Sequence, residues 1–400
     1  MIAFDPSEDE AAILDEVRKF AQAELRKLGR ECEKARAIPD DLRRTYQGLG
    51  LATLEWPEAL GGAGLSPVAR VMIEEELAWG DAGLAIGLDG PGLASLAVLE
   101  LAAEDQRARW LRRLAEPGHT AALAIAEADL GAELGHFTTT ATLAPEGGYA
   151  LSGRKLFVLQ SPLADTFVVL AKLAGGAGGN GAFVVEKGAK GLTLGREDDR
   201  IGLQAVRSGE VLLDDVRVGL DARLEPTGEW AAAYDRFLAR IWILTAARAV
   251  GVARASLEYA TFYAQDRSAF GRKIGSFQGI AFKIADMAME TDGARWLVWR
   301  AAANLAKGRD IAREAAQAAL YANDTCVRAA IECVQVLGGA GFMEDYPAEK
   351  WMREARALAM IGGGDAVRAH LAAEREYGKE HEAAADPQAA FAAFGQAFGT

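Results

Sequence analysis

Apolar side chains recur at helical spacing through most of the first 120 residues and again through most of the chain beyond residue 229. In both stretches they return at i, i+3 and i+4, which is the period of an amphipathic α-helix. The first stretch predicts a helix that begins at the capping box Ser7–Glu10 and another from Pro67 to Trp79. The second predicts long helices with short connections, typical of a four-helix bundle, over residues 230–264, 277–307, 310–337 and 347–378.

Between these helical stretches the pattern changes to short β-rich runs separated by Gly, Asp and Asn turns. Strands are predicted at Tyr149–Gly153, Thr166–Ala171, Gly181–Val185 and Glu210–Leu213, with Gly175–Gly181 as a hairpin tip. Several short strands in sequence predict a small β-barrel or sandwich. The predicted fold class is therefore α+β and multidomain: an N-terminal α-helical domain (1–120), a middle β-barrel or sandwich (121–228), a C-terminal four-helix bundle (229–379) and a tail (380–400).

Composition narrows the class of protein. The chain has 400 residues, enough for two or three domains, and its net charge of -13 argues against nucleic acid or an anionic membrane as partner. Three scattered cysteines indicate a reducing compartment, and four histidines show no metal-ligand spacing. The acidic N-terminus lacks the apolar segment of a signal peptide, and no apolar run reaches the length of a transmembrane helix. We therefore expect a cytoplasmic protein without a metal site.

The stretch Ala246–Gln278 carries the most chemistry. Its first half is a helix with a stripe of small residues, which allows neighbouring helices to approach closely. Beyond it, a sharp corner brings together Arg267, Phe270 and Gln278. A guanidinium, an aromatic ring and a carboxamide can together hold a pyrophosphate and a flat heterocycle. Composition alone favours a solvated basic turn between two helices.

This corner resembles the flavin-contacting turn of the acyl-CoA dehydrogenase family, R-x-x-F-G-x-x-I-x-x-F-Q after an Ala-rich helix. Three further segments are similar to that family in the same order along the chain. They are the W-P-E-x-x-G-G-x-G-L-S loop at Trp56–Ser66, the segment Leu123–Ala132 (family L-A-x-T-E-P-x-x-G-S) and the segment Gly153–Leu159 (family G-x-K-x-W-I-T). The resemblance covers nearly all of residues 5–375 and includes the order helical domain, β domain, helical bundle.

The resemblance implies an FAD that lies extended between the β domain and the bundle, with part of its site supplied by a neighbouring subunit. It also implies an acyl-CoA substrate, an electron-transfer flavoprotein as electron acceptor, a place in fatty acid metabolism, and a homo-oligomer (dimer or tetramer), with a hetero-oligomer as the alternative. The FAD-contacting residues carried over in the β domain are Leu123, Ile125, Ala126, Gly131, Ala132, Phe157, Val158 and Leu159. Those in the bundle are Arg267, Phe270, Gln278, Gln335, Val336, Gly338, Gly339, Gly364 and Asp365.

Two features of the family's pattern are altered. Ala126, Ala132 and Leu159 stand where the family has hydroxyl residues, so the usual hydrogen bonds from those side chains are missing. The implied substrate contacts are Trp242, Arg240, Gly362 and Gly363, and Arg240 and Arg248 are candidates for the nucleotide tail of the thioester. Trp79, Leu93 and Trp242 are candidates for setting the depth of the acyl pocket.

The catalytic base is the second departure. Removing two hydrogens from an acyl thioester needs a base for the α-proton while the flavin takes the β-hydride. The family's usual glutamate position corresponds to Gly362, and the alternative position on the earlier helix corresponds to Ile241; neither is acidic. Asp365 is the displaced candidate, although a helix N-terminus stabilises a carboxylate and lowers its basicity.

These features support three functions. The leading one is FAD-dependent α,β-dehydrogenation of an acyl-CoA thioester. The alternatives are a catalytically silent FAD-binding subunit of a heteromeric dehydrogenase, and a flavin oxidase or monooxygenase on the same fold.

Overall fold

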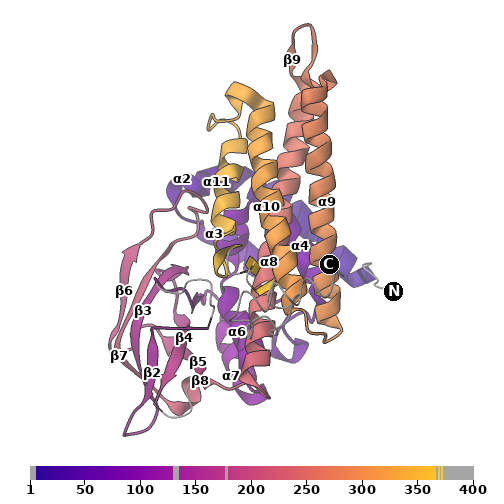
Figure 1. The fold of residues 1–400 in the computed structure, drawn as a ribbon. Helices are drawn as coiled ribbons and strands as arrows, with labels where there is room; N and C mark the ends of the chain where they lie inside the picture. Colours follow the sequence, from indigo (N-terminus) through magenta and orange to yellow (C-terminus); the bar gives the residue numbers. More distant parts are fainter. Residues whose placement is uncertain (1–5, 129–134, 176–178, 366–367, 370, 373–400) are drawn as a thin grey trace, which may run out of the picture.

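The computed structural model describes residues 6–128, 135–175, 179–365, 368–369 and 371–372 of the 400-residue chain. Figure 1 shows a β-sheet on one side of the molecule and a body of long helices on the other. The shorter N-terminal helices lie between them, and α6 contacts both strand β1 and the long helix α8. The predicted order of a helical domain, a sheet domain and a helical domain is confirmed.

The N-terminal part is helical from its capping box onward. Ser7 Oγ accepts a hydrogen bond from the Glu10 amide at 3.2 Å, and the Glu10 carboxylate accepts one from the Ser7 amide at 2.9 Å. The first helix continues through a π-helical stretch, Ala21–Leu25, into the second. The helices are α1 (Glu8–Phe20), α2 (Arg26–Ala35), α3 (Asp40–Gly48), α4 (Pro67–Gly80), α5 (Ala82–Leu88), α6 (Gly92–Leu101) and α7 (Glu104–Leu114).

Helices α5 and α6 carry apolar residues on nearly all sides. Most of these residues are buried against other elements. Among the described helices none is by itself long and apolar enough to span a membrane. This bent pair, with 57° between its two members, passes that test by length and composition. The break between the two helices is the turn Asp89–Gly92.

The middle part is one eight-stranded sheet. Its order is β6-β7-β3-β2-β4-β5-β8, with β1 added parallel to β4. The pairs β1–β4 and β2–β4 are parallel and the others antiparallel. The strands are β1 (Ala121–Ala124), β2 (Thr140–Leu143), β3 (Tyr149–Leu159), β4 (Thr166–Ala174), β5 (Asn180–Glu186), β6 (Leu192–Glu197), β7 (Ser208–Val218) and β8 (Arg223–Leu224).

Strand β4 explains how the sheet is attached to the helices. Its successive residues alternate between two buried clusters, so both of its faces are covered. Val168 and Leu170 pack with the helices, whereas Phe167 and Val169 pack in a second core on the other face of the sheet. Leu123 of β1 belongs to the helix-facing set, which places the start of the middle domain directly against α6.

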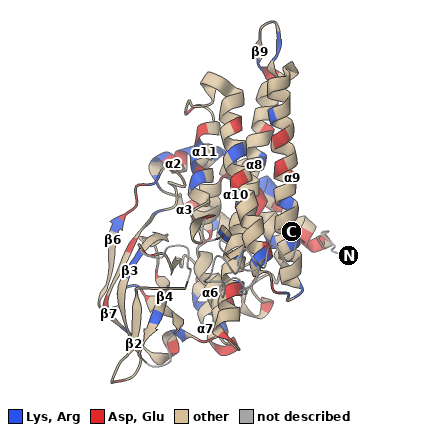
Figure 2. Cartoon of the chain, in the orientation of Figure 1, with Lys and Arg blue, Asp and Glu red and all other residues tan. Residues whose placement is uncertain are grey.

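Up to residue 358, the C-terminal part is built from the helices α8 (Trp230–Asp266), α9 (Gln278–Ala306), α10 (Ala312–Leu337) and α11 (Ala348–Leu358). With a rise of 1.5 Å per residue, α8 is about 55 Å long. Its far end carries a two-stranded hairpin, β9 (Ser268–Ala269) and β10 (Arg272–Lys273), and Figure 2 shows basic residues at this tip.

The helix predicted over 347–378 ends much earlier, at Leu358, which corrects that prediction. Three consecutive glycines, Gly362–Gly364, have φ of 76°, 101° and 76°. L-residues with side chains rarely adopt this left-handed region, so the run forms a loop that the Ala-rich flanks concealed. The chain returns to helix directly after this glycine run, at Asp365.

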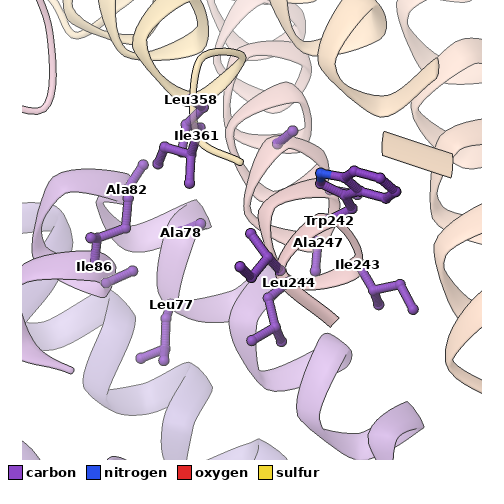
Figure 3. Close-up of a cluster of buried hydrophobic side chains, with 14 of the residues drawn as sticks. Leu77, Ala78, Ala82, Ile86, Trp242, Ile243, Leu244, Ala247, Leu358 and Ile361 are labelled. Atoms are coloured by element: carbon purple, nitrogen blue, oxygen red, sulfur yellow. The ribbon is translucent and has the colours of Figure 1, made fainter. Parts of the chain in front are cut away.

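Small residues set the spacing between α8 and α4. A Cβ on Gly251 would lie 2.4 Å from the backbone oxygen of Glu75, so the backbones of the two helices approach each other closely at this point. Seven residues earlier on α8, Figure 3 shows Leu244 on the side that faces Leu77 and Ala78, with Leu358 and Ile361 above them. This packing brings the chain after α11 close to the middle of α8.

Candidate active site

A cavity of about 470 Å³ lies where the sheet, α5–α6, α8 and the chain after α11 meet. Its sheet wall contains Leu123, Ile125, Ala126, Phe157 and Leu159, all of them predicted FAD contacts. Its helical wall includes the residues Ile86, Asp89, Gly92, Leu93, Ile241, Arg248, Arg356, Ala357, Met360, Ile361, Gly362 and Gly363. The lining is mostly apolar with a few polar groups, which is typical of a small-molecule site.

The two positions predicted for a catalytic base meet in this cavity. A Cβ on Gly362 would lie 3.0 Å from Cγ2 of Ile241, so the C-terminal loop and α8 present both positions to the same space. The indole nitrogen of Trp242 donates a hydrogen bond to the Gly362 carbonyl at 2.8 Å and points toward that loop in Figure 3. Trp242 is therefore an anchor for the loop. A glutamate at position 362 would have to adopt a φ of 76° in a crowded position.

Asp365 lies in a different environment from the one expected of a base. Its carboxylate accepts hydrogen bonds from Asn323 at 3.1 Å and from Arg368 at 2.8 Å. Arg368 is buried and also donates to the carbonyls of Ala359 and Ile361. Asp365 is absent from the described residues that line the cavity. The geometry therefore argues against Asp365 as the base and assigns it to holding the glycine loop.

Among the described residues, Glu127 and Asp89 are the acidic side chains in the cavity lining. The carboxylate of Glu127 is held in a hydrogen-bond network. It accepts hydrogen bonds from Lys155 Nζ at 2.6 Å and from the backbone amides of Thr138 at 2.6 Å and Thr139 at 3.1 Å. Burial opposes its ionisation, but these hydrogen bonds outweigh burial and lower the pKa of Glu127 to about 2. So weak a base cannot take an α-proton efficiently near neutral pH.

The predicted sheet contacts need one correction, at Val158. Phe157 lies at an irregularity of β3, with φ 51° and 62% of its surface exposed, and presents its ring to the cavity. Val158 points the other way, into the core on the far face of the sheet, because neighbouring strand residues alternate in direction. Its side chain cannot line the site. Gly131 and Ala132 lie outside the described residues.

The second predicted group of FAD contacts is far from this cavity. Arg267, Phe270 and Gln278 lie at the tip of the α8–α9 hairpin, and the helical rise puts about 39 Å between Ile241 and Arg267. Phe270 is 96% exposed. Gln335, Gly338 and Gly339 are exposed at the C-terminal end of α10, whereas the side chain of Val336 is buried in the bundle core, so the contact predicted for this segment is limited at Val336 to the backbone.

Some predicted substrate contacts also prove to be structural. Arg240 pairs with Glu55 at 2.8 Å and with Glu100 at 2.5 Å, and it is absent from the described cavity lining. It is therefore not available to the nucleotide tail of a thioester, which corrects that expectation. Trp79 donates to Glu258 at 2.7 Å and also lies outside that lining, whereas Leu93 lies within it.

Sequence reasoning missed several polar residues of the cavity, among them Asp89 and Gln160; the others are Arg200, Ser208 and Arg356. Asp89 begins the Asp-Gly-Pro-Gly turn that interrupts an otherwise apolar run, and that interruption was an available signal. Gln160 follows the matched segment Gly153–Leu159 by one residue and has a φ of 62°, which no local pattern announced.

Comparison with known proteins gives a consistent result for all three parts of the chain. Residues 7–117, 122–216 and 230–377 match the family models for the acyl-CoA dehydrogenase N-terminal, middle and C-terminal domains. An acyl-CoA dehydrogenase of Bacillus subtilis is 34% identical over 357 residues, 88% of this chain and 93% of that protein. The caffeyl-CoA reductase-Etf complex subunit CarC of Acetobacterium woodii is 30% identical, over 90% of this chain and 96% of that protein. The structure of butyryl-CoA dehydrogenase from Megasphaera elsdenii superposes with a TM-score of 0.87 at 29% identity, covering 94% of this chain and 100% of that chain.

Proposed function

Because the chain belongs to the acyl-CoA dehydrogenase family, we propose that it is an FAD-dependent oxidoreductase that removes two hydrogens from the α and β carbons of an acyl-CoA thioester. The observation that carries this proposal is the cavity itself. The residues predicted to contact the flavin, Leu123, Ile125, Ala126, Phe157 and Leu159, line the same cavity as Ile241, Gly362 and Gly363. A flat cofactor and an extended acyl group can share such a space.

The residues of the sheet wall fit a flavin ring. The exposed face of Phe157 and the side chains of Leu123, Ile125 and Leu159 offer an apolar surface for a flat heterocycle. When bound, FAD supplies the two-electron acceptor for the reaction. Ala126 and Leu159 have no hydroxyl group that could hydrogen-bond to the flavin. Backbone groups and apolar contacts of the sheet wall therefore contribute more of the affinity for FAD.

Homo-oligomerisation, as a dimer or tetramer, completes the proposal. The tip residues Arg267, Phe270 and Gln278 are too far from the cavity of their own chain to hold the same cofactor, so they serve a neighbouring copy. Large apolar side chains also remain exposed along α9, at Phe282, Met289 and Trp296. Their seven-residue spacing puts them on one face of the helix, which is a suitable surface for a second copy.

An electron-transfer flavoprotein is the proposed electron acceptor. The relative from Acetobacterium woodii is by name a subunit of a complex with Etf and acts on a CoA thioester. The same arrangement here would return the bound flavin to its oxidised state after each turnover.

The missing base favours one second candidate, a catalytically silent FAD-binding subunit. Ile241 and Gly362 occupy both expected base positions, and neither can take a proton. In that case the cavity would hold FAD and thioester while the partner subunit performs the chemistry.

An anaerobic titration separates the two functions. The purified, FAD-loaded protein is titrated with acyl-CoAs of several chain lengths while the flavin absorbance is followed. Bleaching with one class of acyl group is expected for a dehydrogenase. Unchanged absorbance with firmly bound FAD would refute dehydrogenation by this chain and favour the silent subunit.

The tip assignment has its own test. Arg267→Ala should lower the FAD content of the purified oligomer, whereas Arg328→Ala should not. Arg328 is a partly exposed arginine on α10 that pairs with Glu290 and Asp324. Equal FAD content in both variants would contradict the assignment of Arg267.

A further inference from the structure

The cavity has a polar end as well as an apolar wall. Ile241 and Arg248 lie on the same stripe of α8, seven residues apart, so the cavity extends about 10 Å along this helix from the Gly362 loop. Strand β1 follows the same direction. Its first residue, Ala121, donates a hydrogen bond to the Gly90 carbonyl at 2.8 Å, and Gly90 belongs to the turn that carries Asp89. The end opposite Gly362 is therefore formed by Asp89, Gly92 and Arg248.

A buried cluster of ion pairs stands behind this end. Glu74 pairs with Arg248 at 2.6 Å and with Arg70 at 2.5 Å. Asp89 lies 3.5 Å from Arg70 and 3.7 Å from Arg248, so its second oxygen is paired only loosely. All four side chains are at most 8% exposed. Two guanidiniums and two carboxylates leave the cluster without net charge.

Two groups of this end have hydrogen-bonding capacity left over. Gln160 is 4% exposed and donates from Nε2 to the Asp89 carbonyl at 2.8 Å, but its buried Oε1 has no partner. Within the described residues, Arg248 donates a hydrogen bond from Nε to the Glu74 carboxylate. Its Nη2 lies 3.7 Å from the Asp89 carboxylate, which is too far for a second hydrogen bond. A buried acceptor without a partner is destabilising, so a ligand group that donates to Gln160 gains affinity there.

We propose that this cavity selects an acyl group whose far end carries a hydroxyl, which donates to Gln160 Oε1 and accepts from the guanidinium of Arg248. This inference rests on the proposed function, because it assigns the chemistry of the acyl tail. A methyl end would bury the Gln160 acceptor and the arginine against hydrocarbon. A carboxylate end would face both Asp89 and the Gln160 oxygen and would give the neutral cluster a net negative charge.

The test uses CoA thioethers, which lack the thioester carbonyl and are therefore not oxidised. Three analogues of equal length, ending in a methyl, a hydroxyl or a carboxyl group, are titrated into the FAD-loaded oligomer by isothermal calorimetry. The hydroxyl-ended analogue should bind about tenfold more tightly than the methyl-ended one. Equal binding of these two, or tightest binding of the carboxyl-ended analogue, would overturn the inference. If none of the three bound, the proposed function itself would fail.

Two variants assign the selectivity to residues. Gln160→Met should bring the hydroxyl-to-methyl ratio close to one, while Gln204→Met, which alters a glutamine outside this cavity's described lining, should leave the ratio unchanged. Asp89→Asn gives the cluster a net positive charge and should move the preference toward the carboxyl-ended analogue. Ratios that stay at the wild-type value in both folded Gln160 and Asp89 variants would remove these residues from the acyl site. The wild-type ratios decide the inference even if a variant does not fold.

Discussion

Glu127 and Lys155 form a buried ion pair that holds the sheet wall of the cavity together. Lys155 is fully buried on β3, and its Nζ also donates to the Ile125 carbonyl at 3.2 Å. The carboxylate of Glu127 also accepts hydrogen bonds from the backbone amides of Thr138 and Thr139, which lie just before β2. One pair therefore ties the chain after β1 to two other strands. Glu127→Gln leaves the shape intact and removes one charge.

The expected loss is large because the remaining charge cannot reach water. Hydrogen bonds outweigh burial and lower the pKa of Glu127 from 4.5 to about 2, a difference worth about 3 kcal/mol. Burial also lowers the pKa of Lys155, from 10.5 to about 8, despite the nearby carboxylate. At pH 7 both groups are charged. Leaving a buried charge without its partner costs about 3–5 kcal/mol, so we expect Glu127→Gln to lose about 3 kcal/mol of unfolding free energy.

The assay is urea denaturation at pH 7 and fixed protein concentration, with a double-mutant cycle. The variants are Glu127→Gln, Lys155→Met and their combination. The combination should lose less than the sum of the single losses because no unpaired charge remains. Glu146→Gln is the control, since Glu146 is in an exposed pair with Arg217, and it should change the free energy by less than about 1 kcal/mol. A loss below about 1 kcal/mol for Glu127→Gln, or additive single losses, would refute the reasoning.

Three further predictions concern other parts of the molecule. Burial raises the pKa of Glu354 to about 7, so this group stabilises the fold below pH 4.5 and that stability is lost as the pH rises through 7; Glu354→Gln should flatten the dependence of the urea midpoint over this range, and an unchanged slope would contradict the assignment. Gly251→Ala should lower the unfolding free energy by about 1–3 kcal/mol, because α4 must move away. Gly279→Ala, on a helix with open space, should not lower it, and equal effects of the two changes on thermal melting would refute the packing argument. Asp365→Asn should retain both FAD and flavin bleaching by acyl-CoA, and loss of bleaching with FAD still bound would restore Asp365 as a base.

The helices were predictable wherever the period was long and its end chemically marked. The bounds of α8 and α10 follow the predicted 230–264 and 310–337 within a few residues. The end of α11 was not predictable from period, because alanines continue the apolar pattern past a loop that exists only through the backbone freedom of Gly362–Gly364. Strands β1, β2, β6 and β8 were missed: β6 is polar at most positions, β1 and β2 have four residues each and β8 has two.

The residues of the cavity also divide into those that the sequence predicted and those that it did not. Segment matches identified the sheet wall around Leu123 and Phe157, since those contacts follow from local sequence. The polar end did not follow, because Arg70, Asp89 and Arg248 meet only after α4, α6 and α8 have packed. Strand alternation could have removed Val158 from the predicted contacts, since Phe157 and Leu159 were already assigned to the cavity.

The length of α8 has a genetic consequence under the proposed oligomer. A change at the Arg267 tip damages the neighbour's site and leaves the cavity of its own chain intact, whereas a change at the Phe157 wall damages its own. In an oligomer assembled from both variants, a chain with an unaltered Phe157 wall can pair with a chain that has an unaltered Arg267 tip, and together they form a complete site. Two variants that are each defective alone would thus restore a fraction of complete sites when co-expressed. The unit on which selection acts at this site is therefore the pair of chains.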